Sequence, residues 1–268
     1  MNAKTMMNSA VSLAREIGAV AVVSFLPRID CEAPLPIVWV EDLQLDVLKD
    51  MTMQDLLDVS ERHLTNAAVH LYLSRTLEEG TVVGVFPHAI VLFDLREAKS
   101  FINVKEFEEY VPRDVMHAVL TLAMEIAVEG REGRKIGTAF IIGDGIAILQ
   151  HSHQAILNPF QGQSPETCNI VNRNNWESVK EFAQIDGVFV VNSDGQILSA
   201  GRYLDMSASD LSLPGGLGGR HRAAAAITKL LPVVGVTISE SGGMVRIFQN
   251  GRLKLSIRSD VRITAIQK

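Results

Sequence analysis

The chain has 268 residues, of which 47% are hydrophobic and 21% charged, as is typical of a globular protein that buries one large core or two smaller ones. No stretch approaches the ~20 consecutive apolar residues that a membrane helix requires. Only two cysteines, Cys31 and Cys168, are present, which argues against a disulfide framework or a metal–thiolate site. We therefore expect a soluble, cytoplasmic protein with no membrane association.

The net charge of −6 is unevenly distributed along the chain. Residues 1–115 contain 10 basic and 18 acidic side chains, whereas residues 116–268 contain 15 basic and 13 acidic ones. An acidic chain is a poor electrostatic match for nucleic acid, so we expect no nucleic-acid partner. A polyphosphate ligand would bind in the second half, and the asymmetry favours two domains.

The first domain is predicted over residues 1–113, where helical and strand patterns alternate. Helical periodicity covers 6–17, 53–63 and 66–79, and strand patterns cover 19–25, 37–40, 80–86 and 89–95. Thr52 is a candidate cap for the second helix, and Pro87 marks the turn between the last two strands. This alternation predicts a mixed β-sheet with helices on it.

The second domain is predicted over residues 114–268, after an acidic segment that marks the boundary. Asp114 is a candidate cap for a helix over 115–128, and Asn172 and Asn174 are candidate caps for a helix that ends near 183. Strand patterns cover 138–144, 188–191, 196–199, 233–239, 244–249 and 253–258, the last two joined by an Asn-Gly turn. Both domains are therefore expected to be α/β (α+β), each a mixed β-sheet flanked by helices.

The most informative segment is a glycine-rich loop, 215–219, which leads through Arg220-His221-Arg222 into an alanine-rich helix. The first amides of a helix lack intrahelical partners and lie at the positive end of its dipole, so such a junction suits an anion. Guanidinium groups add donors that match phosphate oxygens. The alternative is a flexible loop followed by an ordinary helix start with exposed basic residues.

Two acidic positions lie at the ends of apolar strands. Asp186 precedes Gly187 and the strand over 188–191, so its carboxylate is expected at the end of a sheet; the alternative is a turn residue. Ser239 and Glu240 follow the strand over 233–239, where Glu240 is either a ligand or a solvated turn residue.

Together these segments resemble the diadenylate cyclase (DAC) family, which condenses two ATP molecules into cyclic di-AMP. The family signatures are Asp-Gly-Ala on a strand, Gly-Thr-Arg-His-Arg at a helix start, and a strand that ends in Ser-Glu. Here they read Asp186-Gly187-Val188, Gly218-Gly219-Arg220-His221-Arg222 and Ser239-Glu240. Flanking segments at 129–137, 158–162 and 200–204 extend the likeness over roughly residues 115–262.

The resemblance implies roles for these residues. Asp186 would lie near the 3′-hydroxyl of ATP and, with Glu240, would hold Mg²⁺ or Mn²⁺, ions that prefer hard oxygen ligands. Arg220, His221 and Arg222 would hold the phosphates and shape the surface that faces a second copy. The other ATP contacts would come from Gly187, Leu204, Gly218, Gly219 and Ser239. Because one domain binds one ATP, the resemblance implies that catalysis needs a homo-oligomer.

The chain departs from the family pattern at two positions. Val188 stands where the family has alanine, which crowds the space beside Asp186, and Gly219 stands where it has threonine, which removes a hydroxyl group. The alternative function is therefore a catalytically weakened nucleotide-binding sensor or regulatory protein.

Other motifs add little. The chain contains no P-loop, no three-glycine dinucleotide fingerprint and no Gly-x-Ser-x-Gly elbow. His151 and His153 have the spacing of one strand face but lack a third ligand, which favours a structural or surface role.

The first domain is similar in pattern to the C-terminal domain of pyruvate kinase, a module found on archaeal diadenylate cyclases.

Overall fold

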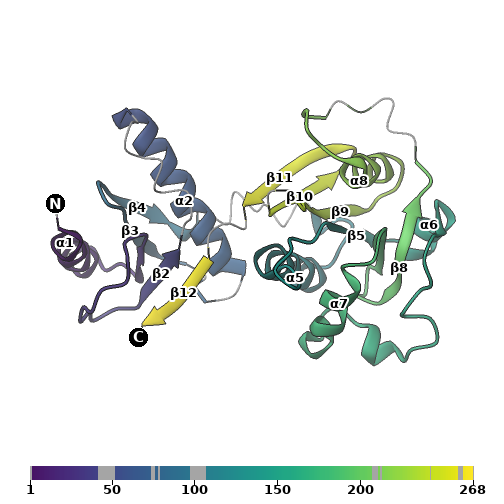
Figure 1. Ribbon diagram of the computed structural model, residues 1–268, viewed down its shortest axis with the longest axis horizontal. Helices are drawn as coiled ribbons and strands as arrows, with labels where there is room; N and C mark the ends of the chain where they lie inside the picture. The colour runs from purple at the N-terminus through teal and green to yellow at the C-terminus, as the bar shows by residue number, and fades with distance from the viewer. Residues whose placement is uncertain are drawn as a thin grey trace. The chain divides into compact units, whose positions relative to one another are not determined.

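The computed structural model describes residues 2–41, 52–73, 76–77, 79–96, 107–206, 211, 213–241, 243–258 and 262–267. The chain divides into two compact units, Met1–Ile102 together with Asp260–Lys268, and Asn103–Ser259 (Figure 1). This division differs from the predicted one, because the last strand belongs to the first unit and not to the domain predicted over 114–268. No helix in the described part of the chain is long and apolar enough to cross a membrane.

The first unit contains a five-stranded sheet of order β12-β2-β1-β3-β4. The central strand, β1 (Ala21–Ser24), is parallel to β2 (Ile37–Glu41) and to β3 (Thr81–Val85). The edge strands β4 (Ile90–Asp94) and β12 (Arg262–Gln267) are antiparallel to their neighbours. The predicted mixed sheet is confirmed, whereas β12 was not predicted.

Helices cover both faces of this sheet. Helix α1 (Ala3–Glu16) packs its buried Met7 into the same core as Val83, and α2 (Met53–Leu73) places Leu64 against Gly84. Val83 and Gly84 are consecutive residues of β3 and so face opposite sides of the sheet. Helix α1, which packs with Val83, and α2, which contacts Gly84, therefore lie on opposite faces.

Helix α2 corrects the sequence analysis, which predicted separate helices over 53–63 and 66–79. The helix continues without a break through 64–65, where no glycine or proline interrupts it. Residues 74, 75 and 78 of the second predicted helix lie outside the described part. The capping prediction is confirmed: the Thr52 hydroxyl accepts a hydrogen bond from the Asp55 amide at 3.2 Å, and the Asp55 carboxylate accepts one from the Thr52 amide at 3.1 Å.

The second unit contains a seven-stranded sheet of order β11-β10-β9-β5-β7-β8-β6. Strands β5 and β7 are parallel, and the other neighbouring pairs are antiparallel. In chain order the strands are β5 (Thr138–Gly143), β6 (Ser152–Gln154), β7 (Val188–Asn192), β8 (Ile197–Leu204), β9 (Val234–Ile238), β10 (Met244–Gln249) and β11 (Arg252–Arg258). The turn between β10 and β11 has positive φ at Asn250 (52°) and Gly251 (73°), which confirms the predicted Asn-Gly hairpin.

Helices again cover both faces of the sheet (Figure 1). Helix α8 (Gly219–Leu230) shares a buried core with Ala139 and Ile141 of β5. On the opposite face, Phe140 stacks on Phe189 with ring centroids 4.8 Å apart, and α7 (Trp176–Phe182) also lies on this side. Burial of both faces explains why β5 and β7 consist of continuous apolar runs rather than alternating ones.

Several helix starts differ from prediction. Helix α5 begins one residue before Asp114 (Arg113–Glu129), so Asp114 lies in its first turn and not at its cap. Asn172 does act as a cap, but of a short 3-10 turn, η3 (Arg173–Asn175), that contains Asn174 and precedes α7. Helix α6 (Gly145–Gln150), which follows β5 directly, was not predicted.

Candidate functional site

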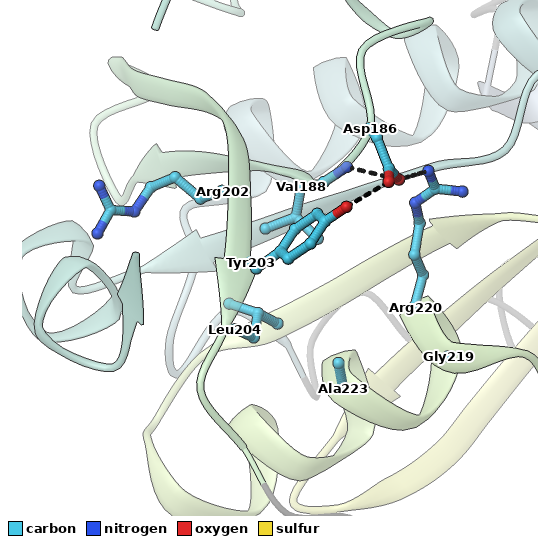
Figure 2. A pocket seen from close by; sticks show the side chains of 9 residues that line it. Asp186, Val188, Arg202, Tyr203, Leu204, Gly219, Arg220 and Ala223 are labelled. Atoms are coloured by element: carbon cyan, nitrogen blue, oxygen red, sulfur yellow. Dashed lines mark hydrogen bonds and ion pairs between the residues drawn. The ribbon is translucent and has the colours of Figure 1, made fainter. Parts of the chain in front are cut away.

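Two adjoining pockets lie at the start of α8 in the second unit, and both are lined by Gly219 and Arg220. The first, which we call the apolar pocket, has a volume of about 450 Å³ (Figure 2). Its lining is Asp186, Gly187, Val188, Arg202, Tyr203, Leu204, Gly219, Arg220 and Ala223. The second, the glycine pocket, has a volume of about 540 Å³. Its lining is Gly137, Gly216, Gly218, Gly219, Arg220, His221, Ile238, Ser239, Glu240 and Ser241.

Asp186 immediately precedes the turn into β7 and presents its carboxylate to the apolar pocket. The carboxylate accepts hydrogen bonds from the Gly187 amide at 3.0 Å, from the Tyr203 hydroxyl and from the Arg220 guanidinium (Figure 2). The hydrogen bond from Tyr203 is the main cause that holds the pKa of Asp186 below its usual value, and the charge of Arg220 adds to it. Asp186 is therefore an ionised group at neutral pH.

Gly187 fixes the direction in which Asp186 points. Its φ of +110° is rarely adopted by other residues, and a Cβ at this position would lie 2.7 Å from the carbonyl oxygen of Arg202. The backbone can turn tightly beside β8 only with glycine at this position. The Asp-Gly pair thus brings the carboxylate to the mouth of the pocket.

The glycine pocket is formed by the loop that enters α8. No side chain caps the start of this helix, since its N-cap is Gly218, and Gly216 has a φ of +80°. The first amides of α8 consequently face the pocket region without intrahelical acceptors, at the positive end of the helix dipole. This arrangement suits an anion of the size of a phosphate chain.

Arg220 lies between the two pockets. Its Nη2 pairs with Asp186, while its Nε is buried and has no hydrogen-bond partner within the described part of the chain. A buried N–H group without an acceptor is costly, so a shift of the Arg220 side chain that brings Nε to an oxygen atom of a ligand would be favourable.

His221 also lines the glycine pocket, but its ring is largely buried, with 8% of the residue exposed. Its Nε2 lies 3.1 Å from Nη1 of Arg246 on β10. Burial, with the charges of Arg246 and Arg220, lowers the pKa of His221 to about 4. The imidazole is therefore neutral at physiological pH.

The structure brings together most of the residues singled out in the sequence. Asp186, Gly187 and Leu204 line the apolar pocket, and Gly218, His221, Ser239 and Glu240 line the glycine pocket. Arg222 is placed elsewhere: it is exposed, belongs to neither lining, and donates from Nε to the carbonyl oxygen of Leu217 at 3.3 Å. Asp186 and Glu240 line different pockets, and the described residues contain no group of three acidic, histidine or cysteine side chains suited to a metal.

Sequence reasoning missed Tyr203, whose hydroxyl binds Asp186. The signal was present, because Tyr203 is adjacent to Leu204, but strand alternation assigns neighbours to opposite faces. It also missed Arg246, which no motif includes. The predicted surface role of His153 fits its exposed position, where Nδ1 lies 2.6 Å from Oδ1 of Asp205.

The fold and the site define an α/β protein in which an uncapped helix start, suited to an anion, adjoins a largely apolar pocket that carries one carboxylate, Asp186. Residues 125–253 match the family model described as "DisA bacterial checkpoint controller nucleotide-binding", the DAC model, and residues 5–96 match "Probable sensor domain DacZ_A". The two matches fall in different units: the DAC model covers a segment of the second unit, and the DacZ_A model covers a segment of the first.

Two curated relatives are named diadenylate cyclase. The protein from Methanocaldococcus jannaschii is 38% identical over 167 residues, which cover 61% of this chain and 53% of the relative. The protein from Haloferax volcanii is 38% identical over 144 residues, which cover 53% of this chain and 52% of the relative. The match thus spans about half the length of the curated relatives.

Two solved structures show limited likeness. A double mutant of DacA from Staphylococcus aureus has a TM-score of 0.36 at 20% identity, covering 58% of this chain and 91% of that one. A hypothetical membrane spanning protein from Bacillus cereus has a TM-score of 0.44 at 14% identity, covering 80% and 94%. Neither score reaches 0.5.

Proposed function

We propose that this chain is a diadenylate cyclase that joins two ATP molecules into cyclic di-AMP and releases two pyrophosphates. The observation that carries the proposal is the pair of pockets joined at Arg220, within the segment that matches the DAC model. The apolar pocket would hold adenine and ribose against Leu204, and the glycine pocket would hold the phosphate chain.

The phosphates are expected at the start of α8. Backbone amides of Gly218 and Gly219 can approach phosphate oxygens closely because no side chain intervenes. Arg220 adds a charged donor whose Nε lacks an acceptor, and the Ser239 hydroxyl lies on the same pocket wall. Arg222 is not assigned a phosphate contact, since its side chain bonds to Leu217.

Asp186 would act on the ribose 3′-hydroxyl. The 3′-oxygen of one nucleotide bonds to the α-phosphorus of the other, the bond to pyrophosphate breaks, and the hydroxyl proton is released. An ionised carboxylate can orient this hydroxyl and accept its hydrogen bond. For this, Arg220 or Tyr203 must release Asp186 when the nucleotide enters, because both occupy the carboxylate in the structure.

The residues present fit a divalent ion that arrives with the nucleotide. The three hydrogen bonds to Asp186 leave one of about four lone-pair sites free, and Glu240 is exposed on the glycine pocket. Mg²⁺ is commonly held by one or two carboxylates together with substrate phosphates, so a preformed cluster of three acids is not required. When bound, Mg²⁺ or Mn²⁺ would neutralise phosphate charge and acidify the attacking hydroxyl.

Catalysis would require two copies of the chain. One apolar pocket accommodates one nucleoside, whereas the product contains two, so two sites must face each other with both nucleotides in line. The unpaired cysteines, Cys31 and Cys168, support placing this reaction in the cytoplasm, where thiols remain reduced.

The test is incubation of the full chain with ATP and Mn²⁺ or Mg²⁺, with cyclic di-AMP and pyrophosphate quantified together. We expect one cyclic dinucleotide per two pyrophosphates, a specific activity that rises with protein concentration, and loss of product on chelation that either ion reverses. No cyclic di-AMP with either metal, over a wide protein concentration range and with folded protein, would overturn the proposal.

A second candidate function is a nucleotide-binding sensor with weakened catalysis, and Val188 is the observation that favours it. Its side chain lines the apolar pocket beside Asp186, with 3% of the residue exposed. Gly219 does not favour this alternative, because it keeps the amide that faces the phosphates. Calorimetry that detects ATP binding to a chain without turnover would support the sensor.

A further inference from the structure

Arg246 occupies a position that no motif of the sequence explains. It lies on β10, whose neighbours are β9 and β11, so it belongs to the interior of the sheet. Its guanidinium contacts the ring of His221, with Nη1 3.1 Å from Nε2. Phe248, two residues further along the same strand, meets the same ring edge to face, with centroids 6.3 Å apart. Two residues of β10, Arg246 and Phe248, therefore contact the ring of His221.

The contact determines where the imidazole carries its proton. A guanidinium has five N–H donors and no acceptor, so Nε2 of His221 must accept the hydrogen bond. A ring that accepts at Nε2 is neutral and carries its proton on Nδ1. The charged groups that act on this ring are the cations Arg246 and Arg220, and both disfavour a second proton.

Within the part of the chain that the structure describes, Arg246 makes no ion pair that would explain its presence. Within the described residues no carboxylate lies within salt-bridge distance of its guanidinium, and burial lowers its pKa. A half-buried cation without a counter-ion is costly for the folded state. The contact that Arg246 does make is with His221, a residue that lines the glycine pocket.

We propose that Arg246 is a positioning residue: it holds His221 as a neutral imidazole with its proton on Nδ1, available to donate to a phosphate oxygen in the glycine pocket. The nature of the ligand rests on the proposed function, whereas the state of the ring does not. In this arrangement the neutral ring of His221 donates a hydrogen bond through Nδ1 and does not act as a charged acid that gives up a proton. Arg246 also adds positive charge behind the ring, which favours an anionic ligand.

The state of the ring can be measured without turnover by ¹⁵N NMR of the imidazole nitrogens in the full chain. Loss of one signal set in His221→Gln identifies the residue. We expect a single Nδ1–H tautomer in the wild type from pH 5.5 to 8. Arg246→Met should populate the Nε2–H tautomer and let the ring titrate nearer to the ordinary value of about 6.5. Arg246→Lys keeps a donor and should preserve the wild-type pattern at least in part.

Binding gives the second readout, with inorganic pyrophosphate as the probe. Loss of one oriented bond to a charged oxygen should weaken pyrophosphate binding by about 10-fold in Arg246→Met. Arg252→Met is the matched control, since Arg252 is an exposed cation on the neighbouring strand β11 and its loss should change binding less than about 2-fold. Near-UV circular dichroism confirms that each variant is folded.

The outcomes separate this inference from the proposed function. A wild-type His221 that carries its proton on Nε2 or is charged at pH 7, or an Arg246→Met variant with an unchanged tautomer, overturns the inference even if cyclic di-AMP is made. Equal losses of pyrophosphate binding in Arg246→Met and Arg252→Met also overturn it, because only general charge would then matter. A chain that makes no cyclic di-AMP but shows the expected tautomers refutes the proposed function alone.

Discussion

Replacing Asp186 with Asn tests the candidate site most directly, because the substitution removes one charge and preserves the size of the side chain. The carboxylate accepts from the Gly187 amide at 3.0 Å and also from Tyr203 and Arg220. An amide has only one oxygen, and its nitrogen cannot accept. One of the two side-chain donors therefore loses its acceptor in the Asp186→Asn variant.

The expected effect is large on turnover and small on stability. Turnover should fall by at least ~100-fold, the lower end of what a positioned base contributes. The free energy of unfolding should change by about 1 kcal/mol or less, since the Asp186 and Arg220 side chains are 57% and 33% exposed and such pairs contribute little. ATP should still bind, because Arg220 remains beside the glycine pocket.

The pH dependence has a defined sign. Because the folded-state pKa of Asp186 is lowered, its stabilising contribution is fully present above the unfolded pKa of about 3.9 and is lost as pH falls through the folded value. The difference in stability between wild type and Asp186→Asn should therefore stay constant from pH 6 to pH 8, as measured by urea unfolding.

The assay compares initial rates of cyclic di-AMP formation with the affinity for 3′-deoxy-ATP, which cannot react at the 3′ position. Asp144→Asn is the matched control, because Asp144 caps α6 through the Ala147 amide at 3.1 Å and asparagine caps equally well. A rate for Asp186→Asn equal to that of the wild type or of this control would refute the assignment of Asp186.

Three further substitutions probe the pocket walls and the framework. Gly219→Thr adds side-chain atoms into open space, since a Cβ there would meet no atom within 4 Å; we expect unchanged stability and turnover raised by up to ~10-fold through one added hydrogen bond, and a loss of ATP affinity would contradict this. Val188→Ala removes two buried methyl groups from the core and should lower the free energy of unfolding by about 2 kcal/mol while lowering KM for ATP; an unchanged KM would show that Val188 does not crowd the nucleotide. Lys180→Met removes a buried ammonium that bonds to three glutamate carboxylates at 2.8–3.1 Å and should destabilise the fold by about 2 kcal/mol in denaturant unfolding. Because those contacts raise the pKa of Lys180, its contribution is fully present below the unfolded value of about 10.4, so a loss that differs between pH 6 and pH 9 would contradict the assignment.

Local patterns were sufficient to predict most of the fold. The strands around 138–144 and 188–191 are largely apolar runs bounded by turns, and the strand around 244–249 is apolar apart from Arg246 and Gln249; the structure has strands at all three places. Strand β12 could not be predicted in this way, because it pairs with β2, more than 200 positions earlier in the chain, and no local signal specifies a distant partner. Helix α6 was missed because it has only 6 residues and continues the apolar run of β5.

The site residues that lie within one sequence motif could be predicted. Those that the folded sheet brings together from distant parts of the chain could not. Gly218 and Gly219 are recognisable because they belong to a group of four glycines that directly precedes Arg220-His221-Arg222 and an alanine-rich helix. The motif alone could not show that the side chains of consecutive residues point in different directions. Helical residues are rotated by about 100° from one to the next, so Arg220, His221 and Arg222 cannot all face one pocket. Arg246 reaches His221 from another strand, a contact that only the folded sheet provides.

Because β12 returns to the first sheet, the second unit is inserted along the chain between two strands of the first unit, β4 and β12. It is therefore tethered at both ends to the same body, and a double tether removes more conformational freedom than the single linker of two domains in series. Deleting β12 would remove one of the two tethers. It would also expose the hydrogen-bonding edge of β2, whose unpaired backbone groups could then pair with other chains.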